Sequence, residues 1–207
     1  MSHYYDFDKD LKSNKRSVYM YLNDIKLSFT TDVGVFSNSE IDYGSFTFLK
    51  ALLKEEKVES LLDVGCGYGV LGITLKYFDK CDYVDMVDIN ERAVLLTKEN
   101  IEYYKFSNSN CFVSNGFESI NRKYDRIVIN PPIRAGKEVI YKMFDDSVNH
   151  LNENGALYIV IKKSLGAPSA MKKLSTIYKN VEIIKKDKGY YIIKSFNWCW
   201  YLLVLSS

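Results

Sequence analysis

The sequence predicts an α/β fold in which a mostly parallel sheet has helices on both faces and ends in an antiparallel hairpin. From residue 59 onward, short apolar segments alternate with amphipathic ones, a pattern typical of βαβ units. The last two apolar segments are separated only by a loop that contains a glycine, which predicts a hairpin. The chain has 207 residues, 47% hydrophobic and 26% charged, so a single main domain with its own core is the simplest arrangement.

Residues 1–44 are predicted to form an N-terminal extension that packs on the core and contains a β-hairpin. Apolar and polar side chains alternate from Val18 to Phe29. Asn23 and Asp24 interrupt this alternation, and both residue types tolerate the positive φ of a tight hairpin turn.

The main domain, residues 45–207, is predicted to alternate strands with helices. The predicted strands are Ser60–Val64, Tyr83–Asp88, Cys111–Ser114, Asp125–Asn130, Ala156–Lys162, Val181–Lys185 and Tyr190–Phe196. The predicted helices are Ser45–Glu56, Gly69–Phe78, Glu91–Tyr104, Lys137–Leu151 and Ser169–Tyr178. Seven strands therefore enter the sheet, with the antiparallel hairpin last.

Charge and cysteine content exclude several classes of protein. The net charge is only +2, yet residues 121–194 carry 15 basic and 7 acidic side chains, which gives either a surface for an acidic partner or a solvated lysine-rich face. The four cysteines form no CxxC or Cys/His cluster, which argues against a zinc site and favours a reducing cytoplasm. No signal peptide is apparent, and the longest apolar run, Trp198–Leu205, is too short for a bilayer span, which needs about 20 residues.

A glycine-rich turn follows the first predicted strand of the main domain. The segment Asp63–Gly69 has glycine at every second position from Gly65, and such a turn lets a ligand approach the backbone. A dinucleotide-binding fingerprint would need a glycine where Val70 stands. Asp63 would repel a pyrophosphate but would favour a cationic amine or sulfonium. The competing interpretation is a tight strand–helix turn without a ligand.

Polar residues also follow the next two strands. Asp88 ends the second strand, where an acid commonly binds the two hydroxyls of a ribose, and Ile89 could pack on an adenine face. Alternatively, Asp88 caps the helix that begins at Glu91. Asn115, followed by Gly116, has the donor and acceptor that read an adenine edge, although it is equally expected as a turn residue.

The fourth strand ends in Asn130-Pro131-Pro132-Ile133. Two prolines hold the chain stiffly after a buried strand. The side-chain oxygen of Asn130 and the carbonyl of Pro131 can point at one spot, where they would accept both hydrogens of a planar amino group. Such binding keeps lone-pair density on the nitrogen, as alkylation at nitrogen requires. The alternative is a rigid loop with no substrate.

Together, Asp63–Gly69, Asp88 and Asn130-Pro131-Pro132 resemble the class I S-adenosylmethionine-dependent methyltransferases of the NPPx subgroup, which act on amino nitrogens. The chain more closely resembles the small-subunit ribosomal RNA guanine-N2 methyltransferase C group, as a single-domain relative. The resemblance covers about residues 3–196. The stretches that carry it are Gly34–Ser37, Asp42–Ser45, Asn130–Lys137 and Lys163–Ser169.

The resemblance implies a Rossmann-like seven-stranded fold, S-adenosylmethionine as cofactor and ribosomal RNA or the small ribosomal subunit as partner, with no metal and no membrane. It implies these cofactor-binding residues: Phe36, Asp42, Gly44, Asp63, Gly65, Cys66, Gly67, Asp88, Ile89, Asn115, Gly116 and Asn130. The implied catalytic residues are Asn130, Pro131, Pro132 and Ile133. The basic residues expected near RNA phosphates are Arg122, Lys123, Arg126, Arg134, Lys137 and Lys163.

Two features depart from that group. Its two-domain members carry a degenerate first copy of the fold, which this sequence lacks. Other members have an aromatic residue after the proline pair, where it stacks on the target base; here the residue is Ile133, so a base would sit against Ile133, Phe36 or Tyr43.

Three functional hypotheses follow from these residues. The first is methylation of a guanine N2 in ribosomal RNA. The second is methylation of another amino group, on adenine N6 or a protein glutamine. The third is a non-catalytic RNA- or cofactor-binding module on the same fold, which the complete set of glycines and the intact Asn-Pro-Pro disfavour.

Overall fold

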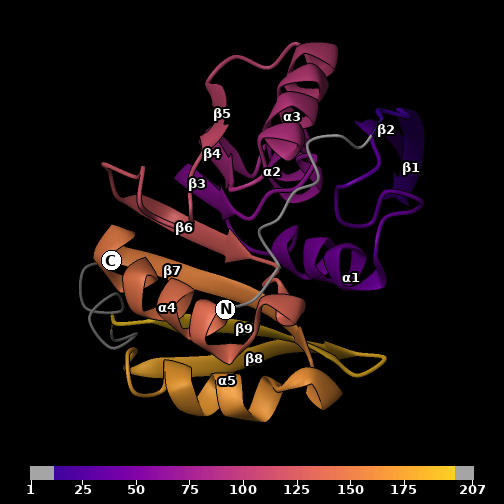
Figure 1. Cartoon of the computed structure of the whole chain (residues 1–207). Helices are drawn as coiled ribbons and strands as arrows, with labels where there is room; N and C mark the ends of the chain where they lie inside the picture. The colour runs from indigo at the N-terminus through magenta and orange to yellow at the C-terminus, as the bar shows by residue number, and fades with distance from the viewer. Residues whose placement is uncertain (1–11, 199–207) are drawn as a thin grey trace.

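The structure, a computed structural model, describes residues 12–198 and contains a seven-stranded sheet and a separate two-stranded hairpin (Figure 1). The hairpin consists of β1 (Arg16–Leu22) and β2 (Ile25–Thr31). The sheet strands are β3 (Val58–Val64), β4 (Cys81–Asp88), β5 (Ser109–Val113), β6 (Tyr124–Ile129), β7 (Leu151–Lys162), β8 (Asn180–Asp187) and β9 (Tyr190–Phe196). The helices are α1 (Tyr43–Leu52), α2 (Val70–Tyr77), α3 (Glu91–Tyr104), α4 (Lys137–Ser147) and α5 (Ala167–Leu174). The predicted apolar run at Trp198–Leu205 lies almost entirely outside the described residues.

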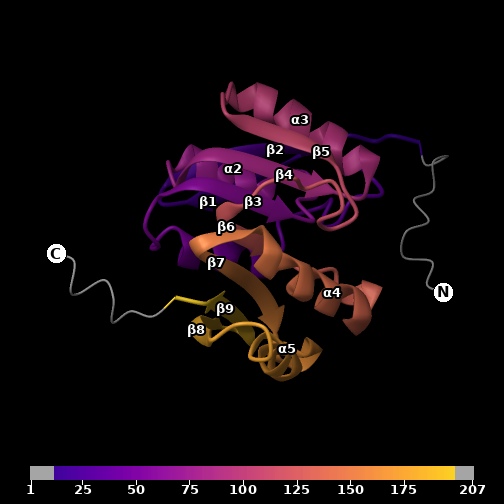
Figure 2. The same ribbon diagram turned by 90° about the vertical axis from the view of Figure 1, so that its left-hand side faces the viewer.

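The strand order is β5-β4-β3-β6-β7-β9-β8, which confirms the predicted mostly parallel sheet with a C-terminal antiparallel hairpin. Only β9 runs against its neighbours, because it pairs antiparallel with both β7 and β8. The strand at this end of the sheet, β8, is therefore parallel to β3, β4, β5, β6 and β7. Figure 2 follows the sheet from β5 and α3 at the top to β8 and α5 at the bottom.

Apolar residues pack on both faces of the sheet, since strands buried on two sides place successive side chains on opposite faces. In β3, Leu61 belongs to the core beneath α1, α2 and the β1–β2 hairpin. Its neighbour Leu62 belongs to the core beneath α4 and α5. The hairpin contributes its buried face, including Leu27 and Phe29, to the first of these cores.

Helix α1 begins and ends earlier than the sequence predicts. The Asp42 side chain caps it by accepting a hydrogen bond from Ser45 N at 3.0 Å. The expected continuation to Glu56 does not form as α-helix. Instead, Glu55 accepts hydrogen bonds from Tyr158 at 2.5 Å and from Lys194 at 2.8 Å, and these tertiary contacts outweigh the helical preference of the segment.

Asn100 of α3 connects the hairpin to the rest of the fold. Its side-chain oxygen accepts from Thr30 N at 2.8 Å, and its nitrogen donates to Thr30 O at 3.0 Å and to Tyr68 O at 2.8 Å. Tyr68 lies in the glycine-rich turn after β3, so one buried amide holds both the hairpin and that turn against α3.

The described part of the chain, residues 12–198, includes no helix with the length and apolar character of a membrane span.

We predict that Asn100→Ala lowers the free energy of unfolding by about 3 kcal/mol, because it leaves three backbone polar groups without their partner. Urea denaturation followed by circular dichroism measures the change. The exposed Asn121→Ala is the matched control and should stay within about 0.5 kcal/mol of the wild type. Equal stabilities for the two variants would show that Asn100 does not hold the hairpin.

Candidate functional site

Parallel pairing brings the predicted motifs together at one edge of the sheet. Val64 at the end of β3 lies opposite Val87 of β4 and opposite Ile129 of β6. The glycine-rich turn, Asp88 and Asn130 each follow one of these adjacent strand ends. Ligands of open α/β sheets bind beyond the carboxyl ends of the strands, so this edge is the candidate site.

The glycine-rich turn is tied to the neighbouring strand. The backbone N–H groups of Gly65 and Cys66 both donate to Val87 O, at 2.8 and 3.0 Å. Gly65 and Gly67 have φ of 75° and 59°, and a Cβ on either would meet nothing within 4 Å. The turn therefore offers open space beside Gly65 and Gly67, while the N–H groups of Gly65, Cys66 and Gly67 already donate inside the protein.

Asp88 links the end of β4 to the glycine-rich turn and to the start of α3. Its Oδ2 accepts from Gly67 N at 2.8 Å and its Oδ1 from Asn90 N at 2.9 Å. Burial raises the pKa of its carboxyl group, and these N–H donors oppose that effect. The cap of α3 is Asn90, whose side chain accepts from Arg92 N, so the alternative interpretation of Asp88 as the helix cap is wrong.

The loop after β5 adjoins Asp88, because Ser114 N donates to Asp88 O at 3.0 Å. Asn115 is exposed in this loop, and its side-chain nitrogen donates to Glu118 Oε1 at 2.9 Å. Gly116 has φ of 58° and open space where a Cβ would point. The structure thus brings Asn115 and Gly116 next to Asp88 and the partly buried Ile89.

Two predicted residues of the Asp63–Gly69 segment have buried side chains. Asp63 is fully buried, with its Oδ2 accepting from Gly72 N in α2 at 2.9 Å. Its Oδ1 has no hydrogen-bond partner among residues 12–198. Burial raises the pKa of Asp63 to about 7. Cys66 is also buried, and burial raises the pKa of its thiol, so it stays protonated.

Asn130 is held from the opposite side by α1. Its Nδ2 donates to Ser45 Oγ at 2.9 Å, and Ser45 N is bound by the capping Asp42. The side-chain oxygen of Asn130, Oδ1, accepts no hydrogen bond from residues 12–198, so it can accept one from a ligand. The sequence does not predict this contact between distant residues, although the Asp-x-x-Ser spacing at residues 42–45 is typical of a helix start.

The first turn of α1 also approaches β9. A Cβ on Gly44 would lie 2.8 Å from Tyr190 Cε1 and 2.8 Å from Asp42 Oδ1, so only glycine fits there without displacement. Gly44 thus lets α1 come close to the sheet edge rather than providing a polar contact itself.

Pro131 is buried, whereas Pro132 and Ile133 are partly exposed. The chain then turns sharply, with Ala135 N donating to Pro132 O at 2.9 Å, before α4 begins. The proline pair and Ile133 therefore lie between the end of β6 and α4 at the candidate site.

Phe36 lies on the loop that joins the hairpin to α1, and its side chain is 69% exposed. Three side chains of the main domain hold this loop: Asn90 donates to Gly34 O, Arg92 donates to Val33 O, and Tyr68 donates to Ser37 O. Tyr68 belongs to the glycine-rich turn, and Asn90 and Arg92 belong to the start of α3, so the loop runs along the site.

Only three of the six basic residues expected near RNA phosphates lie at the candidate edge. Arg122 and Lys123 precede β6 and line a hollow with Glu59 and Asp82 at the opposite, amino-terminal edge of the sheet. Arg126 is 3% exposed and donates to Glu56 O at 2.7 Å, so it cannot reach a phosphate. The remaining three, Arg134, Lys137 and Lys163, follow carboxyl strand ends and are exposed at the candidate edge.

The described residues contain no group of three or more His, Cys, Asp or Glu side chains placed as metal ligands.

Residues 26–194 match the family model described as "Methyltransferase small domain". The chain belongs to this family. The match covers the hairpin strand β2, the whole sheet up to β9 and every element of the candidate site, and it confirms the resemblance drawn from the glycine-rich and Asn-Pro-Pro motifs.

Members of the family and related structures resemble this chain to different extents. "Uncharacterized protein YbxB" of Bacillus subtilis is 42% identical over 195 residues, which is 93% of this chain and 97% of that protein. "Ribosomal RNA small subunit methyltransferase C" of Psychromonas ingrahamii is 32% identical over 177 residues. That alignment covers 83% of this chain but 49% of the relative, so the chain spans about half of its length.

Among solved structures, "T. Thermophilus 16S rRNA N2 G1207 methyltransferase (RsmC) in complex with AdoMet and Guanosine" superposes with a TM-score of 0.80. The two chains are 22% identical, and the superposition covers 91% of this chain and 52% of that chain. The similarity establishes that both chains have the same methyltransferase fold.

We predict that Asp63→Asn becomes more stable relative to the wild type as the pH rises. A raised pKa means that the folded wild type holds its proton more tightly than the unfolded chain. The stabilising effect of that proton is present below about pH 4 and is lost as the pH rises through about 7. Asparagine keeps an acceptor for Gly72 N and does not ionise.

Urea denaturation of both proteins at about pH 5 and about pH 8 tests this prediction. The stability difference should shift in favour of Asp63→Asn by more than about 1 kcal/mol. A difference that does not change with pH would show that Asp63 keeps an ordinary pKa.

Proposed function

We propose that this protein transfers a methyl group from S-adenosylmethionine to the exocyclic amine of a guanine in ribosomal RNA. The observation that carries the proposal is the orientation of Asn130. Its amide nitrogen is bound to Ser45, so its carbonyl oxygen is left for an amino group. Family membership supports the reaction class, and the site residues support the kind of acceptor.

The residues at the glycine-rich turn fit S-adenosylmethionine better than a dinucleotide. A Cβ at positions 65, 67 or 116 would meet nothing within 4 Å, so an adenosine or a methionine chain could approach the backbone there. The N–H groups of Gly65, Cys66 and Gly67 already have acceptors, so they are not offered to a pyrophosphate. The cofactor would supply a methyl group on a positively charged sulfur.

Most of the predicted cofactor residues have a role in this proposal. Asp88 would accept hydrogen bonds from the ribose hydroxyls with the lone pairs that Gly67 and Asn90 leave free. Ile89 and Asn115 would hold the adenine. Phe36 and the Asp42–Gly44 segment would close over the methionine end. Asp63 would act from beneath the turn, by fixing the start of α2 through Gly72.

The acceptor amine would be held by two oxygens. Asn130 Oδ1 and the carbonyl of Pro131 would each accept one hydrogen of the amino group, which turns the nitrogen lone pair toward the methyl donor. No strong base is needed before the attack, because the proton can leave to water after the new bond forms. Positioning and placement of partial charge would therefore supply most of the acceleration.

The guanine of ribosomal RNA is proposed as the target because of the relatives that this chain resembles. The name "Ribosomal RNA small subunit methyltransferase C" gives ribosomal RNA as the substrate, and the name of the T. thermophilus 16S rRNA enzyme adds the N2 atom of a guanine. Arg134, Lys137 and Lys163 are exposed at the same edge and would contact RNA phosphates. Ile133 would pack against the base, which must first leave its stack.

The test is incubation of the protein with unmodified small ribosomal subunits and S-adenosylmethionine that carries a radiolabelled methyl group. Digestion of the RNA then identifies the labelled nucleoside. We expect N2-methylguanosine, and we expect Asn130→Ala to lower kcat at least about 100-fold, as loss of a group that binds the reacting centre does. Label in another nucleoside or in protein would contradict the guanine assignment, and no label would contradict the reaction.

Ser45→Ala is the sharper variant in the same assay. It leaves Asn130 in place but frees its amide to rotate, so kcat should fall about ten-fold while cofactor affinity stays near that of the wild type. The exposed Ser175→Ala is the matched control. An unchanged kcat for Ser45→Ala would contradict the role assigned to the amide orientation.

A further inference from the structure

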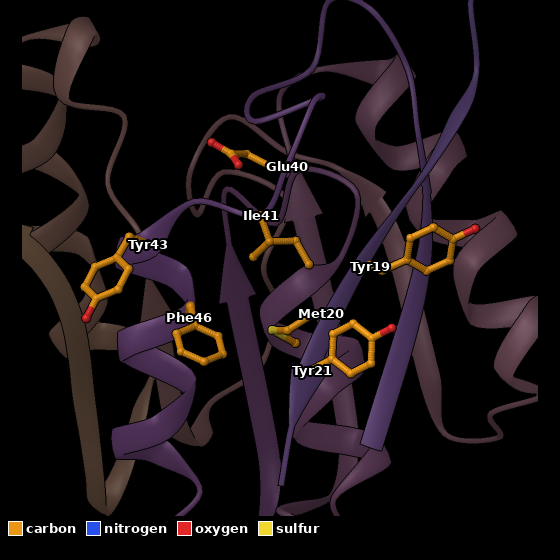
Figure 3. Close-up of a pocket in the computed structure, with 7 residues that line it drawn as sticks. All are labelled: Tyr19, Met20, Tyr21, Glu40, Ile41, Tyr43 and Phe46. Atoms are coloured by element: carbon orange, nitrogen blue, oxygen red, sulfur yellow. The ribbon is translucent and has the colours of Figure 1, made fainter. Parts of the chain in front are cut away.

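A hollow of about 400 Å³ lies between the N-terminal hairpin and α1, outside the site described above (Figure 3). Strand β1 contributes Tyr19, Met20 and Tyr21, and α1 contributes Tyr43 and Phe46. Glu40 belongs to the loop between them. We call this feature the tyrosine hollow. Its volume falls in the range of small-ligand sites.

The aromatic side chains of the tyrosine hollow are unusually accessible. Tyr19 is 51% exposed and Tyr21 is 66% exposed. They share one face of β1, whereas Val18, Met20 and Leu22 on the other face are buried in the core. Two residues along a strand are about 7 Å apart, so the rings form a row. Aromatic rings arranged along a strand are the surface on which single-stranded nucleic acids stack their bases.

Lysines lie near three of the aromatic rings that line the hollow, those of Tyr19, Tyr43 and Phe46. Lys26 Nζ is 3.9 Å from the centroid of Tyr19, Lys188 Nζ is 4.6 Å from that of Tyr43, and Lys50 Nζ is 5.5 Å from that of Phe46. Among residues 12–198, none of these three lysines forms an ion pair with a carboxylate. Their charge is therefore available to phosphate groups.

The positive charge continues beyond the hollow along α1. The pKa of Lys185 on β8 is lowered by burial and by the nearby positive charges of Lys50 and Lys54, while Asp187 opposes this effect. Glu40 is the acidic group of the lining, and a carboxylate accepts hydrogen bonds from base amino groups. Rings, lysines and one acceptor together match a nucleotide better than a neutral or acidic protein surface.

The tyrosine hollow is also connected to the proposed active site. Tyr43 is the first residue of α1, and Ser45, two residues later, holds Asn130. The hollow and the Asn130 amide therefore lie at the same helix start. A single strand of RNA whose target base reaches Asn130 would therefore approach the helix start where Tyr43 lines the hollow.

We propose that the tyrosine hollow binds a nucleotide of single-stranded RNA next to the target, with its base on Tyr19 and Tyr21 and its phosphates on Lys26 and Lys50. This inference rests on the proposed function, because the substrate there is RNA. It assigns the N-terminal hairpin a role in substrate binding that the methyl-transfer residues do not have.

The test is a fluorescence-anisotropy titration with a short, fluorescein-labelled, single-stranded RNA of mixed sequence. The double variant Tyr19→Ala/Tyr21→Ala should raise the Kd about ten-fold or more, because stacking on each ring is lost. Tyr19→Phe/Tyr21→Phe keeps the rings and should bind within about two-fold of the wild type. Tyr103→Ala, on α3 with a side chain that is 68% exposed, is the matched control.

A second series tests the phosphate contacts. Lys26→Gln/Lys50→Gln should reduce the slope of log affinity against log salt concentration by about 1.4, or about 0.7 for each lost contact on a single strand. Lys98→Gln, an exposed lysine of α3, should leave the slope unchanged.

Equal RNA affinity for the wild type and the alanine pair would overturn the proposal. So would a wild type that self-associates in gel filtration while the alanine pair is monomeric with unchanged RNA affinity, since the surface would then bind a second copy of the chain. Methyl transfer by the wild type, measured separately, distinguishes the two proposals. Transfer without dependence of RNA binding on the tyrosines rejects only the hollow, and tyrosine-dependent binding without transfer rejects only the proposed reaction.

Discussion

The parallel pairing of β3 with both β4 and β6 is the constraint on which the site depends. It fixes the ends of three adjacent strands at one edge, and each end is followed by a different chemical group. The pairing continues past the strands, since Gly65 and Cys66 still donate to Val87 beyond the last residue of β3. Asp88 then extends the connection by accepting from Gly67 and Asn90, so the turn and the start of α3 have a fixed relation to each other.

Two elements outside the sheet complete this edge. Helix α1 reaches it through Gly44, where the absence of a side chain allows contact with Tyr190, and positions Asn130 through Ser45. The loop before α1 is held by Asn90, Arg92 and Tyr68, all of which belong to the glycine turn or to the start of α3. The N-terminal hairpin therefore forms part of the same structural unit as the site, and α3 binds it through Asn100 at Thr30 and through Tyr104 at Ser28.

Much of this arrangement could be predicted from the sequence because the information is local. Glycine spacing, an acid at a strand end and Asn-Pro-Pro after an apolar run identify the three motifs, and parallel strands necessarily bring them to one edge. Contacts between distant residues could not be predicted in the same way. Ser45 and Asn130 are 85 positions apart, and nothing in the local pattern places Asp63 beneath the turn rather than at its surface.

The basic residues show that a short separation along the chain does not predict proximity to the site. Arg122 and Lys123 are within ten positions of Asn130, but β6 lies between them, and a strand of six residues spans about 20 Å. They therefore lie at the opposite edge of the sheet. The C-terminal end of helix α1 also depends on contacts between distant residues. Glu55 is bound by Tyr158 and Lys194, which follow it by about a hundred residues or more, and a local pattern does not reveal such partners.

Isothermal titration calorimetry with S-adenosylmethionine tests the central claim most directly, namely that the glycine turn and Asp88 form a cofactor site. We expect one molecule bound per chain and an affinity at least about ten-fold weaker in Asp88→Ala, because two charge-assisted hydrogen bonds are lost. NADH, titrated in the same way, should not bind. Tight binding of NADH, or S-adenosylmethionine binding that does not depend on Asp88, would contradict the account.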